Sequence, residues 1–175
     1  LIIGAALFAL AAVLGYLAFG HVQLRVKIWL DPWTYANDEG YQLVQALFGL
    51  ASGGLFGTGL GEGYPQFIPF AKTDFISAAL GEELGLAGML ALLMLFAILV
   101  ERGLRTGLAC RDPFGTLLAV GLSSVFALQV FVTVGGVTRL IPLTGLTTPF
   151  LSYGGSALVI NWVMIALLLR ISDRN

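Results

Sequence analysis

The chain has 175 residues and a net charge of −1; charged residues make up 11% of it and apolar residues 58%, with a mean hydropathy of +0.92. A soluble domain has roughly 25% charged residues, whereas from Pro113 to Leu169 the only charge here is Arg139, so this stretch must face lipid. The same balance excludes a disordered chain, and the lack of a basic cluster argues against nucleic acid as a partner.

Four segments are long and apolar enough to cross about 30 Å of hydrocarbon, which takes roughly 20 residues each. We expect spans at about residues 1–20, 75–100, 114–137 and 146–169. The chain starts inside an apolar run without a Met or a charged leader, which is typical of a cut through a longer protein. The sequence predicts an all-α polytopic membrane protein in which residues 1–175 form a single membrane domain.

Residues 21–74 form a long connection between the first two spans. The sequence WLDPW at 29–33 is typical of a membrane interface. Residues 43–61 are uncharged but contain six glycines, and each glycine weakens a helix by up to about 1 kcal/mol. We therefore expect an amphipathic, surface-lying or re-entrant helix to about Leu50, followed by irregular chain. A connection of this length is usually functional.

The positions of the arginines predict the orientation. The short connection 101–112 and the C-terminal tail carry five of them: Arg102, Arg105, Arg111, Arg170 and Arg174. Short arginine-rich segments stay in the cytoplasm, so we expect this connection and the C-terminus to be cytoplasmic and residues 21–74 to lie outside.

Lys72, Thr73 and Asp74 lie where the outer connection meets the second span. In one interpretation Asp74 is a general base at the interface and Lys72 helps to hold an anion. In the other, Thr73 or Asp74 is the N-cap of the second span. Spacing alone favours the cap, and the two roles are compatible.

Glu82, Glu83 and Arg139 are the other charged candidates. Both glutamates lie about two turns into the second span, where an ionisable group is costly and indicates a functional site. Alternatively, one of them pairs with Arg139 or Lys72 inside the bundle. Arg139 lies in VTRLIPLTGLTTP (137–149), whose prolines prevent a continuous helix. It is either a phosphate clamp or an interfacial anchor.

A patch of small residues, LSYGGSA (151–157), opens the fourth span. Its glycines and serines loosen the helix and let another backbone approach. By itself such a patch indicates packing more than catalysis.

These stretches together resemble the SEDS family (shape, elongation, division and sporulation), the FtsW/RodA/SpoVE proteins. The resemblance covers nearly the whole chain, in five ordered motifs: GYQLVQA (40–46), GTGLGEG (57–63), TDF to GEELG (within 69–85), DPFG (112–115) and IPLTGLTTPFLSYGGSA (141–157). The IWLDPW loop and TRLIPLTGLTTPF are most similar to the RodA branch, in particular to its actinobacterial members.

The resemblance implies a ten-span protein of the bacterial cytoplasmic (inner) membrane, of which this chain supplies the last four spans. It implies a peptidoglycan glycosyltransferase that polymerises lipid II at the outer face during cell elongation or division, with a class B penicillin-binding protein as partner. Asp74 matches the family's essential aspartate and would deprotonate the acceptor sugar. Arg139, Lys72, residues outside this chain or a divalent cation (magnesium or manganese) would hold the undecaprenyl diphosphate. The remaining expected substrate-binding residues are Thr73, Glu82, Glu83, Ser152, Tyr153, Gly154, Gly155 and Ser156.

The sequence departs from the family at three places near these motifs, one of which is Ala157 in place of a frequent second Ser. Phe70, Ala71 and Lys72 stand where members often have Glu-Ala-His, and Thr133 stands where Asn is usual. Two other functions are compatible with the composition, a transporter (flippase) for lipid-linked precursors and a non-catalytic scaffold for the penicillin-binding protein. A transporter predicts charges at the bilayer midplane, and the third and fourth spans have none, which favours the enzyme.

Overall fold

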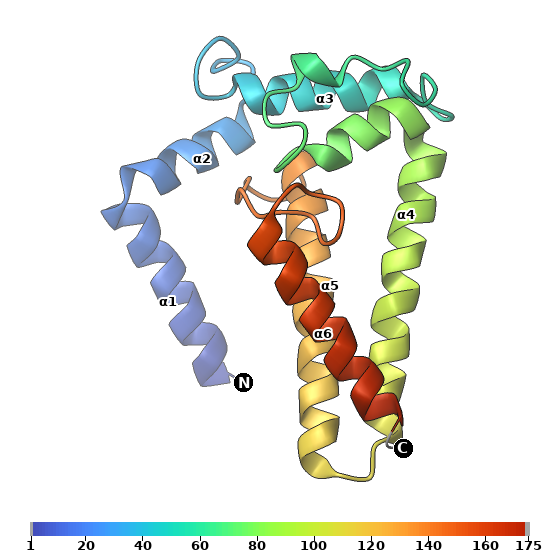
Figure 1. The fold of residues 1–175 in the computed structure, drawn as a ribbon. Helices are drawn as coiled ribbons and strands as arrows, with labels where there is room; N and C mark the ends of the chain where they lie inside the picture. Colours follow the sequence, from blue (N-terminus) through green and yellow to red (C-terminus); the bar gives the residue numbers. More distant parts are fainter. Residues whose placement is uncertain (1, 174–175) are drawn as a thin grey trace.

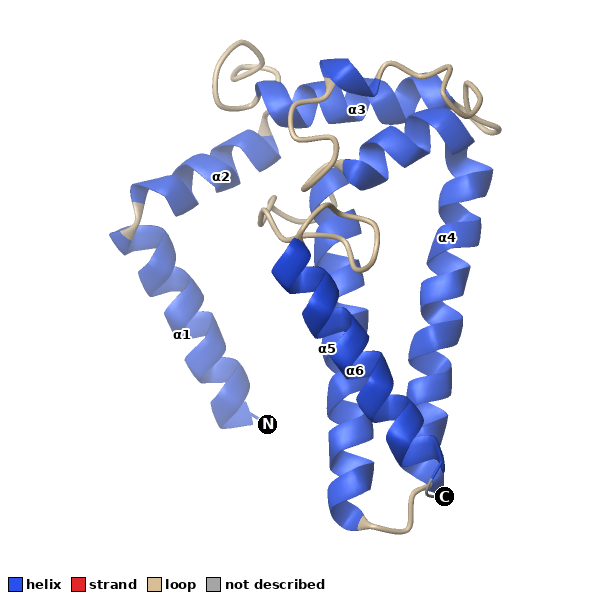
Figure 2. Cartoon of the chain, in the orientation of Figure 1, coloured by secondary structure: helices blue, strands red, loops and turns tan. Residues whose placement is uncertain are grey.

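The computed structural model describes residues 2–173, and in this range the regular structure is entirely helical (Figures 1 and 2). The elements follow in the order α1 (Ile2–Ala18), α2 (Gly20–Leu30), α3 (Tyr41–Gly53), the 3₁₀ turn η1 (Pro65–Phe67), α4 (Ile76–Ala109), α5 (Pro113–Val137) and α6 (Gly155–Asp173). The expectation of an all-α fold is confirmed.

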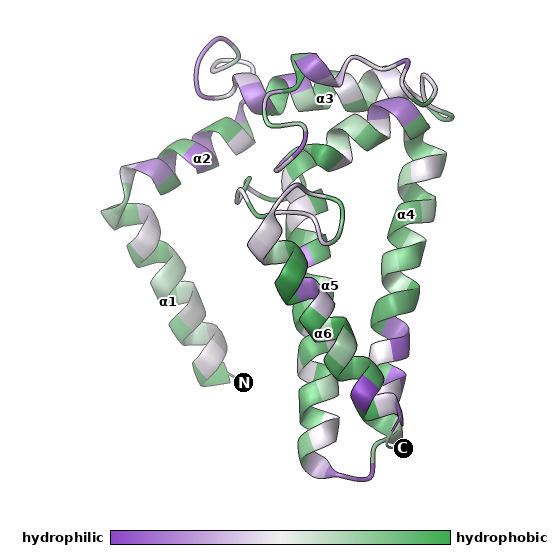
Figure 3. Ribbon diagram, in the orientation of Figure 1, coloured by the Kyte–Doolittle hydropathy of each residue, from purple (hydrophilic) through white to green (hydrophobic). Residues whose placement is uncertain are grey.

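Three helices, α4, α5 and α6, are long and apolar enough to cross a membrane. At 1.5 Å per residue, the 25 residues of α5 extend over roughly 37 Å, more than the hydrocarbon thickness of about 30 Å. A fourth span results if α1 and α2, which meet at a bend of 99°, are counted as one. Figure 3 shows the apolar middle of the long helices, with polar residues gathered toward their ends.

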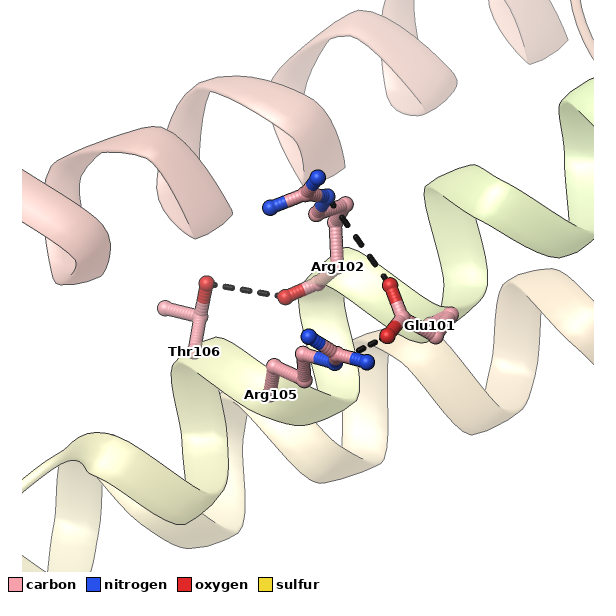
Figure 4. Close-up of polar contacts among 4 residues, drawn as sticks. All are labelled: Glu101, Arg102, Arg105 and Thr106. Atoms are coloured by element: carbon pink, nitrogen blue, oxygen red, sulfur yellow. Dashed lines mark hydrogen bonds and ion pairs between the residues drawn. The ribbon is translucent and has the colours of Figure 1, made fainter.

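The two ends of the bundle differ. The α4–α5 connection and the end of α6 lie together at the lower end in Figure 1, which we call the arginine end; α3 crosses the opposite end, which we call the α3 end. At the arginine end Glu101 forms ion pairs with Arg102, at 3.8 Å, and with Arg105, and Thr106 donates to the carbonyl of Arg102 at 3.0 Å (Figure 4). These pairs are solvent-exposed and contribute little to stability.

Side chains from the three long helices pack a core between them. Phe126 of α5 is buried and lies 5.8 Å from the ring of Phe96 of α4 and 5.9 Å from the ring of Phe150. Met164 brings α6 into the same cluster. Phe150 belongs to the connection between α5 and α6, so the core holds this part of the connection against the bundle.

The second expected span, 75–100, is not one straight helix. α4 breaks at Gly85, whose φ of 66° and ψ of −169° are not helical, and this region of backbone space is essentially restricted to glycine. The short leg before the break runs beneath α3, and the long leg after it descends through the bundle (Figure 1). Glu82 and Glu83 therefore lie on the leg at the α3 end and not in the descending part.

The glycine-rich chain after α3 supplies the hydrogen bonds that the break removes. In an unbroken helix Leu86 and Ala87 would donate to the carbonyls of Glu82 and Glu83. Instead the amides of Leu86 and Ala87 donate to the carbonyls of Gly54 and Leu55, at 2.9 and 3.0 Å. The carbonyls of Glu82 and Glu83 accept from the amides of residues 58 and 59, at 2.9 and 3.1 Å. Irregular backbone at membrane depth persists only when its polar groups are satisfied in this way.

Candidate functional site

Asp74 lies in the connection between η1 and α4, at the α3 end. Its side chain is half-buried and precedes the buried Phe75. α4 begins at Ile76 with Phe75 as its N-cap and without a side-chain cap hydrogen bond, while the Thr73 hydroxyl donates to the carbonyl of Phe70 at 3.2 Å. The interpretation of Thr73 or Asp74 as the N-cap is therefore wrong, and the Asp74 carboxylate is not used to start the helix.

The connection between α5 and α6 folds onto the segment that carries Asp74. The Ser152 hydroxyl donates to the carbonyl of Thr73 at 2.6 Å and accepts from the amide of Thr148 at 2.8 Å. The amide of Tyr153 donates to the carbonyl of Lys72 at 2.7 Å. Ser152 is 8% exposed, so these bonds are shielded from water. They join two segments that are distant in sequence into one site.

Two residues of this site adopt the left-handed backbone region, which is uncommon for side-chain-bearing residues. Phe70, just before Lys72, has φ of 57°, and Phe150, just before Ser152, has φ of 62°. Each costs of order 1 kcal/mol or more, and such conformations cluster at functional sites where the surrounding structure holds them.

The other expected binding residues of the α5–α6 connection lie at its end. The side chain of Tyr153 is 85% exposed. Gly154 is half-buried, and Gly155 and Ser156, which open α6, are exposed. The structure thus brings Lys72, Thr73, Asp74, Ser152 and Tyr153 together, with the two glycines and Ser156 directly after them.

Arg25 is a cation beside Asp74 that the sequence analysis did not assign. A Cβ at Gly145 would lie 3.6 Å from Oδ2 of Asp74 and 3.8 Å from both terminal nitrogens of Arg25. Arg25 belongs to α2, and its Nη1 donates to the carbonyl of Leu143 at 2.7 Å. Asp74 and Arg25 lie 49 positions apart in the sequence, and no local pattern links them; only its charge within the outer connection could have marked Arg25 as a candidate.

Arg139, expected near Asp74 as a phosphate clamp, is instead directed at the end of α2. Its Nε and Nη2 donate to the carbonyls of Trp29 and Leu30, both at 2.9 Å, and its own carbonyl accepts from the Trp29 indole at 3.0 Å. Free carbonyls at a helix C-terminus favour a cation. The interfacial-anchor interpretation fits this geometry, whereas the role as a clamp stays a prediction.

Asp31, at the same end of α2, has a pKa below its ordinary value. The main cause is the Thr34 hydroxyl, which donates to its carboxylate at 2.6 Å; the Thr34 amide and, to a smaller extent, the charge of Arg139 act in the same direction.

Glu82 is buried, 5% exposed, and its carboxylate accepts from the amide of Tyr64 at 3.0 Å. Within residues 2–173 no ion pair joins it to Arg139 or Lys72, contrary to the pairing considered from the sequence. Glu83 is half-buried, and its side chain lies against Gly63. Both glutamates thus face the glycine-rich chain, and their role in binding substrate stays a prediction.

A divalent cation requires several oxygen ligands. Among the described residues no group of three or more His, Cys, Asp or Glu side chains gathers in one place, and Asp74 is the carboxylate found between Arg25 and the α5–α6 connection. These described side chains do not form a cation site by themselves.

The helices and this site define a multi-pass helical membrane protein with a carboxylate held between two connections at one end of its spans. The model of the cell cycle protein family FtsW/RodA/SpoVE matches residues 1–175. The chain belongs to this family, and the resemblance seen in the sequence is confirmed.

Relatives agree with this assignment over almost the whole chain. It is 60% identical over 171 residues to the peptidoglycan glycosyltransferase RodA of Mycobacterium tuberculosis, covering 98% of this chain and 36% of the relative. It is 45% identical over 150 residues to the stage V sporulation protein E of Bacillus subtilis, covering 85% and 41%. The chain thus spans about a third of the length of the mycobacterial relative and matches its C-terminal part.

Two solved structures share the fold. One describes how a peptidoglycan synthase complex coordinates polymerization and crosslinking; it has a TM-score of 0.76 and 31% identity over 97% of this chain and 48% of the other. The second is a crystal structure of a mutant of the rod shape determining protein RodA of Thermus thermophilus, with a TM-score of 0.57 and 33% identity over 73% and 39%.

Proposed function

We propose that this chain provides the acceptor-activating site of a peptidoglycan glycosyltransferase that polymerises lipid II. The observation that carries the proposal is Asp74: a half-buried carboxylate, neither a helix cap nor, within the described residues, part of an ion pair or hydrogen bond. The name of the mycobacterial relative, peptidoglycan glycosyltransferase RodA, supports the same reaction.

In this reaction the Asp74 carboxylate accepts the proton of the 4-hydroxyl of the acceptor N-acetylglucosamine. The oxygen attacks the anomeric carbon of the lipid-linked donor, a glycosidic bond forms, and the bond from that carbon to the diphosphate breaks. Undecaprenyl diphosphate leaves with the bonding electrons. General-base assistance of this kind contributes roughly 10²–10⁴-fold to the rate. Mg²⁺ or Mn²⁺ entering with the diphosphate stays a prediction.

The location that we propose is the outer face of the bacterial cytoplasmic membrane. Support comes from the separation of the two ends: Arg102, Arg105 and Arg111 lie at the arginine end, and Asp74 lies at the α3 end. Arginine-rich short connections stay cytoplasmic. Single cysteines at Asp38 and Arg111, labelled in intact cells with an impermeant maleimide, test this; labelling at 111 and not at 38 contradicts it.

We also propose a class B penicillin-binding protein as the partner, because the solved relative concerns polymerization and crosslinking by one complex. A scaffold role alone would not need the Asp74 carboxylate. Transport of the lipid-linked precursor would favour charged groups at the midplane, and α5 contains no charged residue.

The test is Asp74→Asn in the full-length protein, reconstituted with lipid II and its partner. We expect polymerisation to fall by about 10²-fold or more while the partner still co-purifies. Asp38→Asn is the matched control, because Asp38 is an exposed carboxylate in the same outer connection, and it should polymerise normally. Normal polymerisation by Asp74→Asn refutes the base assignment.

A further inference from the structure

We propose that Arg25 binds the diphosphate of the lipid-linked donor, opposite Asp74 across Gly145. The inference rests on the proposed function, because it assigns the leaving group of that reaction to a residue of the same site.

The position of Arg25 relative to Asp74 carries the proposal. Oδ2 of Asp74 and both terminal nitrogens of Arg25 lie 3.6 and 3.8 Å from the place where a Cβ at Gly145 would be. They are therefore no farther apart than these two lengths taken together. They are also not an ion pair, since none joins them within residues 2–173. The two groups therefore lie close to each other beside Gly145 without direct contact.

A separation of at most 3.6 and 3.8 Å taken together, without direct pairing, leaves room for substrate oxygens that contact both groups. A general base lies about 3 Å from the oxygen that it deprotonates, and that oxygen lies about 3 Å from the carbon that it attacks. The leaving diphosphate is on the far side of that carbon. A cation that stabilises it therefore must not be paired directly with the base, and within residues 2–173 no ion pair joins Arg25 to Asp74.

The guanidinium of Arg25 has N–H donors that remain available to a ligand. A guanidinium carries five N–H groups, and among residues 2–173 the one side-chain hydrogen bond of Arg25 uses Nη1 on the carbonyl of Leu143, at 2.7 Å. This bond orients the side chain, and the planar guanidinium suits two phosphate oxygens at once. The side chain is exposed, so a ligand has access to it.

The other cations of the site are less suited. The guanidinium of Arg139 is bonded to two carbonyls of α2. Lys72 presents a flexible ammonium, a point charge that does not match two oxygens. Glu39 lines a cavity of about 190 Å³ together with Arg25, but within the described residues no ion pair joins the two.

Gly145 lies beside both groups. Its φ is 73°, a conformation that side-chain-bearing residues rarely adopt, and the side chain that it lacks would project toward both Asp74 and Arg25. The backbone can therefore approach a ligand held between them.

The experiment measures binding and not turnover. Full-length Asp74→Asn protein, purified in detergent, is titrated with undecaprenyl diphosphate and, separately, with uncharged undecaprenol. Adding Arg25→Gln should weaken diphosphate binding by about 10–100-fold, the range for losing a charged hydrogen-bond partner, and leave undecaprenol binding unchanged. Arg25→Lys should fall between the two, since it keeps the charge and loses the planar donors.

Lys27→Gln is the matched control, because it removes the same charge from the same helix, and residues two apart do not share a helix face. It should bind the diphosphate normally. Equal diphosphate binding with and without Arg25, equal losses from Lys27→Gln, or a parallel loss of undecaprenol binding would each overturn the proposal. Because no readout here depends on turnover, an active Asp74→Asn would refute the base assignment and leave this measurement intact.

Discussion

Gly85→Ala tests whether the break in α4 is held by backbone contact with the glycine-rich chain. A Cβ at this position would meet the amide of Gly57 and lie 2.7 and 2.8 Å from the carbonyl carbons of Phe56 and Leu55. These are backbone atoms, so no rotamer change relieves the clash. The φ of 66° and ψ of −169° add strain for any residue with a side chain.

The magnitude follows from the contacts at the break. The backbone strain costs about 1–3 kcal/mol, and four backbone hydrogen bonds between residues 54–59 and 82–87 are worth roughly 1 kcal/mol each. If the clash breaks half of them, we expect Gly85→Ala to lose about 3–5 kcal/mol of stability. Polymerisation should fall as well, because Asp74 lies in the connection that leads directly into the short leg of α4.

The assay is thermal unfolding of the full-length protein in detergent, with Gly121→Ala as the matched control. Gly121 lies within α5, and a Cβ there would have nothing within 4 Å. Its substitution should be neutral or favourable to the helix by up to about 1 kcal/mol. An unchanged unfolding temperature for Gly85→Ala would show that the break does not depend on this close approach.

Three further outcomes are expected. Ser152→Ala should lower stability by about 1–3 kcal/mol, the cost of leaving a buried polar group unbonded, here the amide of Thr148, and thermal unfolding measures it. Arg139→Lys should destabilise the end of α2, measured by faster hydrogen exchange there, with diphosphate binding unchanged; a loss of binding at unchanged exchange favours the clamp. Thr34→Val should raise the pKa of Asp31, seen by NMR titration. Because the folded pKa is lowered, this contribution to stability is present above the unfolded pKa and lost as pH falls through the folded one.

Much of the architecture is predictable from sequence, because a long apolar run has few alternatives to a membrane helix. The expected spans at 114–137 and 146–169 correspond to α5 and α6, although α6 begins only at Gly155. The surface-lying helix followed by irregular glycine-rich chain corresponds to α3 and the segment after it. The break at Gly85 was not predicted, because hydropathy is the same for a straight and a bent apolar run.

The sequence predicts only the part of the site that lies within one continuous segment. The position of Asp74 at the entrance to α4 follows from its place between a polar connection and an apolar run. The contacts that hold it do not: Ser152 lies 79 positions from Thr73 and bonds to its backbone carbonyl, which any residue type possesses. No residue pattern marks such a partner, so Arg25 was missed and Arg139, the more conspicuous charge in an apolar stretch, was chosen.

Arg139 and Arg25 have different roles, although both join α2 to the chain that follows α5. Arg139 and Arg25 both connect α2 to the chain after α5, one through carbonyls of α2 and the other through the carbonyl of Leu143. Arg139 is half-buried, with Nε and Nη2 both bonded, so its charge is committed to the end of the helix. Arg25 is exposed and retains donors. The anchored arginine therefore sets where α2 lies, and the position of α2 sets how far Arg25 stands from Asp74.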